Sequence, residues 1–268
     1  MFNFRRRSRA EIVAESAEAG FEPVRPRPGV GNLFGLASGS PSPFQRFRHA
    51  DGVNLFSANN GATTLVVGFG GIRGSLMMGT VAVLEALDSG ACDLLLLSDF
   101  RRLHFDHGVE NYAATLPELM HKVAAIAAQR RYTNVITYGS SMGGFPALRG
   151  GQMLGARRAV SVGGRFAWHP VKVRDGEKAV GAFDPICACR APFATPCYAL
   201  YAEGKKDDAD HAAMLAAIMP GCVRVPMPYD KHNVAHAIAR RNRLPAFFAE
   251  LFDPDAEPDP ARLRALLA

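Results

Sequence analysis

Short apolar runs alternate with longer stretches of helical spacing through the middle of the chain. The apolar runs predict strands at 63–68, 92–98, 134–138, 159–162, 197–202 and 222–226. The longer stretches predict helices at 75–87, 116–129, 143–150, 208–218 and 233–251. A further run at 54–58 predicts an antiparallel strand at one edge of the sheet. The pattern is therefore that of strands and helices in alternation.

Some predicted strands are apolar on both faces. Four leucines in succession occupy 94–97, as expected when helices cover both sides of a parallel sheet. With the alternation of elements, this predicts an α/β fold, with a doubly wound, mostly parallel sheet flanked by helices. We expect an N-terminal helix and Pro/Gly-rich extension over 1–45, the α/β domain over 46–252, and a Pro-rich acidic linker with a short C-terminal helix over 253–268.

Composition narrows the class of protein. Hydrophobic residues make up 48% and charged residues 21% of the 268 residues, which is typical of a globular chain. No apolar stretch is long enough for a membrane span, and the N-terminus lacks the apolar region of a secretory signal. Five cysteines without a C-x-x-C pair favour reduced thiols. The sequence thus predicts a cytoplasmic protein.

The net charge of +6 is scattered along the chain apart from two short arginine clusters, at 5–9 and 240–243. Such a distribution is typical of solvated surface, so we expect no nucleic-acid partner. The sequence also implies no metal and no organic cofactor.

A glycine–serine motif follows the strand predicted at 134–138. It reads Gly139-Ser140-Ser141-Met142-Gly143 and fits G-x-S-x-G. Small residues on either side of the serine allow a tight strand-to-helix turn that lifts its hydroxyl out of the sheet. Ser140 occupies the variable position, so we predict Ser141 as a nucleophile.

A serine nucleophile needs a base and an orienting acid, which in this architecture follow it in the order acid, then histidine. His232 lies on the loop after the last predicted strand and is the expected base, with His236 as the alternative. Asp207 follows the preceding strand and is the expected acid. Asp208 is the main alternative and Glu203 a weaker one, while Asp210 is expected to cap the following helix.

Acyl transfer also needs N–H donors for the developing oxyanion. The glycine-rich turn after the strand at 63–68 brings its backbone near the serine, so we expect the Phe69 and Met142 N–H groups to serve.

The motif at 139–144, the Gly68-Phe69-Gly70-Gly71 turn and Lys231-His232-Asn233 together resemble the α/β-hydrolase superfamily. Within it, the chain is loosely similar to bacterial members associated with cell-surface polysaccharide genes. The resemblance covers about 50–252 and implies a Ser–His–acid triad of Ser141, His232 and Asp207. Where the superfamily often has His-Gly before the oxyanion residue, this chain has Val-Gly.

These residues predict a serine hydrolase or acyltransferase that acts on a small-molecule or glycan acyl ester, or on a thioester, through an acyl-enzyme. A catalytically silent binding protein of the same fold is the main alternative. The turn at 68–74 also resembles a dinucleotide-binding turn, with Asp99 after the next strand, but Arg73 breaks the G-x-G-x-x-G pattern. His104-Phe105-Asp106-His107 could start a metal site, although no second ligand cluster accompanies it.

Overall fold

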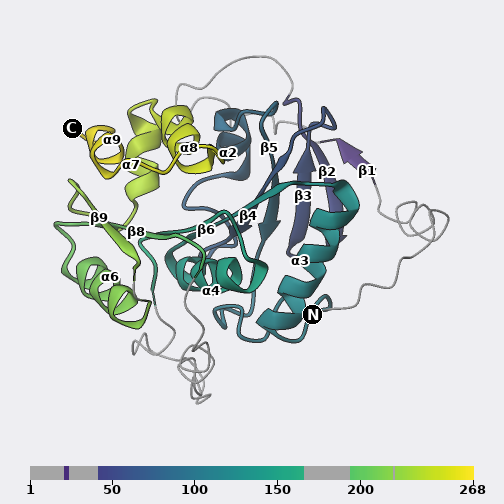
Figure 1. Ribbon diagram of the computed structural model, residues 1–268, viewed down its shortest axis with the longest axis horizontal. Coiled ribbons are helices and arrows are strands. Elements are labelled where there is room, and N and C mark those ends of the chain that lie inside the picture. Colours follow the sequence, from purple (N-terminus) through teal and green to yellow (C-terminus); the bar gives the residue numbers. More distant parts are fainter. Residues whose placement is uncertain (1–20, 24–41, 166–193, 220) are drawn as a thin grey trace.

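The computed structural model describes residues 21–23, 42–165, 194–219 and 221–268 (Figure 1). The helix expected near the N-terminus lies outside these residues. The strands are β1 (Phe21–Pro23), β2 (Gln45–Ala50), β3 (Val53–Ser57), β4 (Thr64–Phe69), β5 (Cys92–Leu97), β6 (Asn134–Ser140), β7 (Arg158–Val162), β8 (Cys197–Ala202) and β9 (Val223–Met227). The helices are α2 (Thr80–Ala86), α3 (Leu116–Arg130), α4 (Gly144–Leu154), α6 (Lys206–Ile218), α7 (Val234–Arg240), α8 (Leu244–Phe252) and α9 (Pro260–Ala265), with a 3-10 turn η1 (Ser141–Gly143).

The described strands form one sheet in the order β1-β2-β3-β5-β4-β6-β7-β8-β9. The six strands from β4 onward are parallel to one another, whereas β1, β2 and β3 join by antiparallel pairing at one edge. The strands β4, β5 and β7 are buried at every position, as expected for strands of a parallel sheet covered on both faces. The predicted mostly parallel α/β sheet is confirmed.

Helices cover both faces of the sheet (Figure 1). On one face, α2, α7, α8 and α9 pack against a large apolar cluster that contains Phe247, Phe248 and Leu263. On the other, α3, α4 and α6 cover two smaller clusters around Phe69 and Phe145. Because the sheet is buried on both sides, its functional groups have to come from the loops at the strand ends.

The structure departs from the predicted elements in three places. The polar strand β2 and the short β1 are absent from the prediction, because a partly exposed edge strand has too few apolar positions to stand out. The helix expected over 233–251 is two helices, α7 and α8, since Asn242 has a left-handed backbone with φ of 56° and Pro245 opens α8. Residues 75–79 form bends, so that α2 begins only at Thr80.

A buried arginine fastens the C-terminal segment to the sheet. Arg158, the first residue of β7, is fully buried, and its guanidinium donates to the carbonyls of Leu251 (3.4 Å), Asp253 (2.7 Å) and Ala256. These bonds offset much of the cost of burying a guanidinium, although its Nε is buried without a partner among the described residues. Arg158 therefore helps to hold the segment after α8, together with Arg157 and Tyr198, before α9 returns Leu263 to the core.

Arg158→Met is expected to lower the free energy of unfolding by about 3 kcal/mol, because the carbonyls of the segment after α8 lose a charged donor. Arg157→Met is the matched control. Arg157 is 43% exposed and donates to Pro254 (2.7 Å), so its loss is expected to cost less than about 1 kcal/mol. Urea unfolding of both variants measures the difference, and equal stabilities would contradict the role given to Arg158.

Candidate active site

Ser141 occupies a strained turn between β6 and α4. It is a non-glycine residue with φ of 52°, a conformation that costs an L-residue free energy and persists only where its surroundings enforce it. The turn begins directly at the end of β6, with Ser141 as the first residue of η1. The side chain therefore leaves the sheet at the carboxyl end of a central parallel strand, as the G-x-S-x-G motif predicts.

The two glycines of the motif allow contacts that no side chain would permit. A Cβ on Gly139 would lie 2.0 Å from the carbonyl oxygen of Gly143, and a Cβ on Gly143 would lie 2.2 Å from that of Phe69. Both distances are far shorter than any non-bonded contact between carbon and oxygen. Gly139 and Gly143 are thus needed for the turn to close against β4.

Ser141 and His232 meet at hydrogen-bond distance. The Nε2 atom of His232 lies 2.9 Å from the Oγ of Ser141, and its Nδ1 lies 2.9 Å from both carboxylate oxygens of Asp208. His232 stands on the loop between β9 and α7, and Asp208 is the third residue of α6. We call Ser141, His232 and Asp208 the Ser–His–Asp array.

Backbone hydrogen bonds join the loop that carries His232 to the segment just before the helix of Asp208. The N–H groups of Glu203 and Gly204, after β8, donate to the carbonyls of Met227 and Tyr229, at the end of β9, at 3.0 Å each. The Asp208 side chain is fully buried, while that of His232 remains 22% exposed. A buried carboxylate thus faces a partly exposed imidazole.

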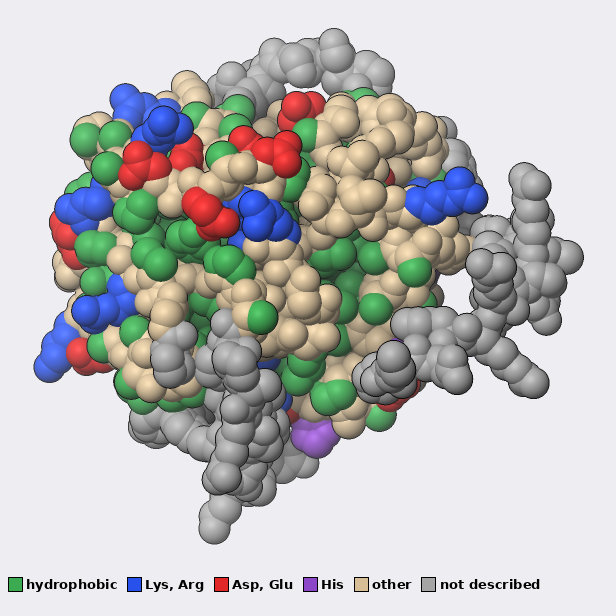
Figure 2. Space-filling model, in the orientation of Figure 1, with side chains coloured by type: hydrophobic (Ala, Val, Ile, Leu, Met, Phe, Trp, Pro, Cys, Tyr) green, Lys and Arg blue, Asp and Glu red, His purple; other side chains and the backbone are tan. Residues whose placement is uncertain are grey.

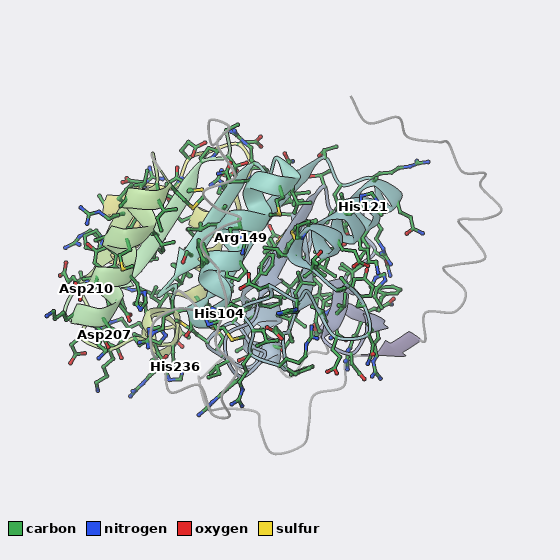
Figure 3. All side chains as sticks on the ribbon, turned by 90° about the horizontal axis from the view of Figure 1, so that it is seen from below. His104, His121, Arg149, Asp207, Asp210 and His236 are labelled. Carbon is green, nitrogen blue, oxygen red and sulfur yellow. The ribbon has the colours of Figure 1, made fainter. Side chains whose placement is uncertain are left out.

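The acid in this array is Asp208, which corrects the expectation of Asp207. Because α6 begins at Lys206, the two aspartates are successive residues of a helix and point about 100° apart. Asp208 points at His232, whereas Asp207 is 49% exposed and lies 3.4 Å from Lys205. Figure 3 shows Asp207 and Asp210 on the same helix. Asp210 lies within α6 and is therefore not its N-cap.

The remaining candidates for base and acid lie elsewhere. His236 belongs to α7, one turn beyond His232 (Figure 3). Glu203 forms an ion pair of 3.1 Å with Arg264, ahead of α6. Neither takes the place of His232 or Asp208 in the array.

Three features typical of a nucleophile elbow coincide: a serine on a tight strand-to-helix turn, the chain order Ser141, Asp208, His232, and positions that follow the parallel strands β6, β8 and β9. The chain has an α/β-hydrolase fold. All three side chains lie at the carboxyl edge of the sheet.

Solved structures with similarity to this α/β-hydrolase fold include three proteins named as hydrolases. A dienelactone hydrolase from Anabaena variabilis is 17% identical over 70% of this chain and 82% of its own, with a TM-score of 0.42. The poly(3-hydroxybutyrate) depolymerase LpqC from Bordetella parapertussis is 13% identical over 95% and 96%, with a TM-score of 0.45. A Pyrococcus furiosus esterase is 14% identical over 78% and 92%, with a TM-score of 0.46.

No protein-family model and no curated protein matches the sequence. At identities of 13–17%, a substrate cannot be transferred from any of these proteins to this chain. The function has to be argued from the side chains of the site.

Phe69, whose N–H group was the expected donor, lies within the sheet. It is the last residue of β4, pairs with Leu97 on one side and Gly139 on the other, and is fully buried, with its ring against Phe105. Its backbone is therefore part of the sheet. The residue that approaches the serine is Gly71, whose Cβ, if present, would lie 3.4 Å from that of Ser141. Met142 lies where expected, next to Ser141 in η1.

Two acidic side chains in the segment 99–107, where a dinucleotide turn and a metal site were considered, bond to other groups of the protein. The carboxylate of Asp99 accepts N–H groups of Arg101, Leu103 and Phe105, so it shapes the loop after β5. Asp106 forms an ion pair of 2.8 Å with the buried Arg149. Among the described residues, no group of three or more His, Cys, Asp or Glu side chains is placed to hold a metal ion.

His104 contacts the turn that carries Ser141. Its side chain hydrogen-bonds to the backbone of Met142, and its own backbone is left-handed, with φ of 54°. Burial lowers the pKa of His104 from the ordinary value, although Asp106 and Asp99 act in the opposite direction. His104 is therefore favoured in its neutral form, as a packing partner of the turn.

Gly163, directly after β7, was not anticipated from the sequence. It has φ of +56°, and a Cβ there would lie 2.9 Å from the Cε1 atom of His232. The signal available was the Gly163-Gly164 pair at the end of a predicted strand.

Gly163→Ala is expected to reduce turnover at least about tenfold with little loss of secondary structure, because the new methyl displaces the His232 ring from Ser141. Gly155→Ala is the matched control, since Gly155 has φ of +59° and open space around it. Both variants carry the same backbone strain, so any difference in kcat between them measures the displacement of His232. Equal kcat values would contradict this account.

Two surface features lie apart from the site. A cavity of about 200 Å³ is lined by 194–197, Met219, Gly221 and Cys222, at the amino ends of β8 and β9. It is at the opposite edge of the sheet from Ser141. On the face in Figure 2, basic and acidic side chains of the described residues are interspersed.

Over the described part of the chain, no helix has the length and apolar character to cross a bilayer.

Proposed function

We propose that the protein is a serine hydrolase that cleaves carboxylic esters, with Ser141 as nucleophile, His232 as general base and Asp208 as the acid that orients it. The observation that carries the proposal is the pair of contacts on His232, with Ser141 Oγ 2.9 Å from Nε2 and Asp208 2.9 Å from Nδ1. A serine hydroxyl becomes a useful nucleophile only when a base in this position accepts its proton.

In the proposed reaction, neutral His232 carries its proton on Nδ1 and donates a hydrogen bond from it to Asp208. The Nε2 atom is then free to take the proton of Ser141. The Oγ of Ser141 then bonds to the ester carbonyl carbon. As the tetrahedral intermediate collapses, the bond to the alcohol oxygen breaks and the imidazolium protonates the leaving alcohol. Water, deprotonated by His232, next attacks the acyl carbon. As this second tetrahedral intermediate collapses, its bond to Oγ breaks, the imidazolium returns its proton to Ser141 and the carboxylic acid leaves.

The developing oxyanion needs donors on the side of Ser141 away from His232. We assign the Met142 N–H, at the first turn of the helix that follows Ser141, where backbone N–H groups have no acceptor within the helix. The second donor belongs to the backbone of the turn after β4, because Gly71 lies against Ser141. In that turn Gly70 donates to Leu97 and Gly71 to Ser75, each at 2.8 Å. The next residue, Ile72, is the donor that we propose.

Exposed apolar side chains support an ester with an apolar substituent. Ile72 is 51% exposed and Phe100 is 64% exposed. They follow β4 and β5, at the same edge of the sheet as Ser141, and the Phe100 ring lies over the turn at Gly74. Apolar surface beside a nucleophile favours binding of an acyl chain or an alkyl group over binding of a charged one.

Acyl transfer, to a glycan hydroxyl or another alcohol, would share the first half of this reaction and differ only in what attacks the acyl-enzyme. Hydrolysis is the simpler proposal because it needs no second substrate site. Product analysis with and without added alcohols distinguishes the two.

The proposal is tested by labelling with a fluorophosphonate probe, together with hydrolysis of p-nitrophenyl esters from acetate to octanoate. Covalent labelling of one site and measurable turnover, greater for the longer acyl chains, are expected. A protein that is folded by circular dichroism but neither labels nor hydrolyses any ester would overturn the proposal and favour a binding protein of the same fold.

A further inference from the structure

Arg165 contacts two members of the Ser–His–Asp array. Its backbone N–H donates to the carbonyl of Ser141 at 3.0 Å, and its Nη2 atom lies 3.4 Å from Oδ1 of Asp208. It comes two residues after Gly163, whose left-handed backbone turns the chain away from the end of β7. The same residue is thus tied through its backbone to the nucleophile and through its side chain to the acid.

The charge of this arginine is directed at a fully buried carboxylate. The Asp208 side chain has no solvent exposure, and that of Arg165 is 28% exposed. Among the residues that the structure describes, Asp208 is the carboxylate within ion-pair distance of Arg165, and the buried Nε of Arg165 has no acceptor. The guanidinium is therefore balanced by the carboxylate that also faces His232.

We propose that Arg165 is a positioning residue that sets the pH at which His232 becomes a base. The proposal rests on the function proposed above. A guanidinium that shares Asp208 reduces the attraction of that carboxylate for a protonated imidazole, and it repels the imidazolium directly. Both effects favour neutral His232, the form that accepts the proton of Ser141, at a lower pH than a Ser–His–Asp array without the arginine would allow.

Other ionisable groups near His232 do not supply this effect. On its own loop, Asp230 and Lys231 precede it and have opposite charges. From α6, Asp207 is paired with Lys205. The uncharged groups against the ring are Ser141, Gly163 and, beside Gly163, the methyl group of Met77. Among the described residues, Arg165, on the loop after β7, is the arginine paired with the aspartate that faces His232.

The test is the rate of fluorophosphonate labelling as a function of pH. In Arg165→Met the midpoint of the rise in rate is expected about one pH unit above that of the wild type, because the variant loses the positive charge beside Asp208. Arg165→Lys retains the charge and is expected to return the midpoint toward the wild-type value. Arg157→Met, which removes an arginine at the other end of β7, is expected to leave the midpoint unchanged.

A folded Arg165→Met variant with the wild-type midpoint would overturn the inference, even if its maximal rate fell, because the arginine would then act only through packing. Arg165→Gln removes the charge and keeps a hydrogen-bond donor, so it gives the same comparison if the Met variant does not fold. Failure of the proposed function is distinguishable, since the wild type would not label at any pH.

Discussion

Ser141→Ala is expected to abolish fluorophosphonate labelling and to lower ester turnover by at least about 10³-fold, with the fold retained. Without its hydroxyl, the residue has no atom that can bond to the carbonyl carbon. The alanine methyl fits the space of the serine side chain, so the turn between β6 and α4 can remain closed. Labelling detected by mass spectrometry, with turnover measured on the same samples, gives the result.

Ser140→Ala is the matched control for this experiment. Ser140 is the adjacent residue, is fully buried at the end of β6, and directs its Oγ toward the carbonyl of Ser75 at 3.4 Å, a weak contact. We expect its loss to leave labelling and turnover near the wild-type values. If Ser141→Ala still labelled, or if Ser140→Ala alone lost labelling, Ser141 would not be the nucleophile.

Asp208→Asn is expected to reduce turnover by about 10³–10⁴-fold. An asparagine amide can donate a hydrogen bond to Nδ1 of His232, which favours the tautomer with its proton on Nε2. In that tautomer Nε2 cannot accept the proton of Ser141, although the distances between the side chains remain nearly the same. The loss is expected in kcat, with KM changed much less, and steady-state kinetics on a p-nitrophenyl ester measure both.

Asp207→Asn distinguishes a specific effect at Asp208 from a general effect of removing negative charge from α6. The side chain of Asp207 is half-exposed, and its ion pair with Lys205 is at the surface. We expect its turnover to stay near that of the wild type, because exposed ion pairs contribute little. The opposite ranking of the two variants would return the role of the acid to Asp207.

The sequence was sufficient to predict the parallel strands, because their apolar runs are bounded by glycine and polar residues. It was not sufficient for β2, where three of the six residues, two arginines and one histidine, are basic or titratable. The break between α7 and α8 at Asn242 was also missed, because an asparagine within a helical pattern does not by itself indicate a left-handed backbone.

In the site, Ser141 and His232 could be predicted because the turn motif and the chain order constrain them. The choice between Asp207 and Asp208 depended on where α6 begins, and a shift of one residue on a helix changes the direction of a side chain by about 100°. The position of Phe69 depended on how far β4 extends. Arg165 could not be found from spacing, because its contacts with Ser141 and Asp208 are made only in the folded chain.

The distribution of the array along the chain has a consequence for how the protein acquires activity during synthesis. Ser141 and His232 are 91 residues apart, and Asp208 lies between them. A ribosome must therefore complete β9 and the loop after it before the nucleophile can gain its base. Under the proposed function, Ser141 has no base to accept its proton until then. Reactivity of Ser141 would thus appear only when the last parallel strand has joined the sheet, and its appearance would report the end of folding rather than the formation of the elbow.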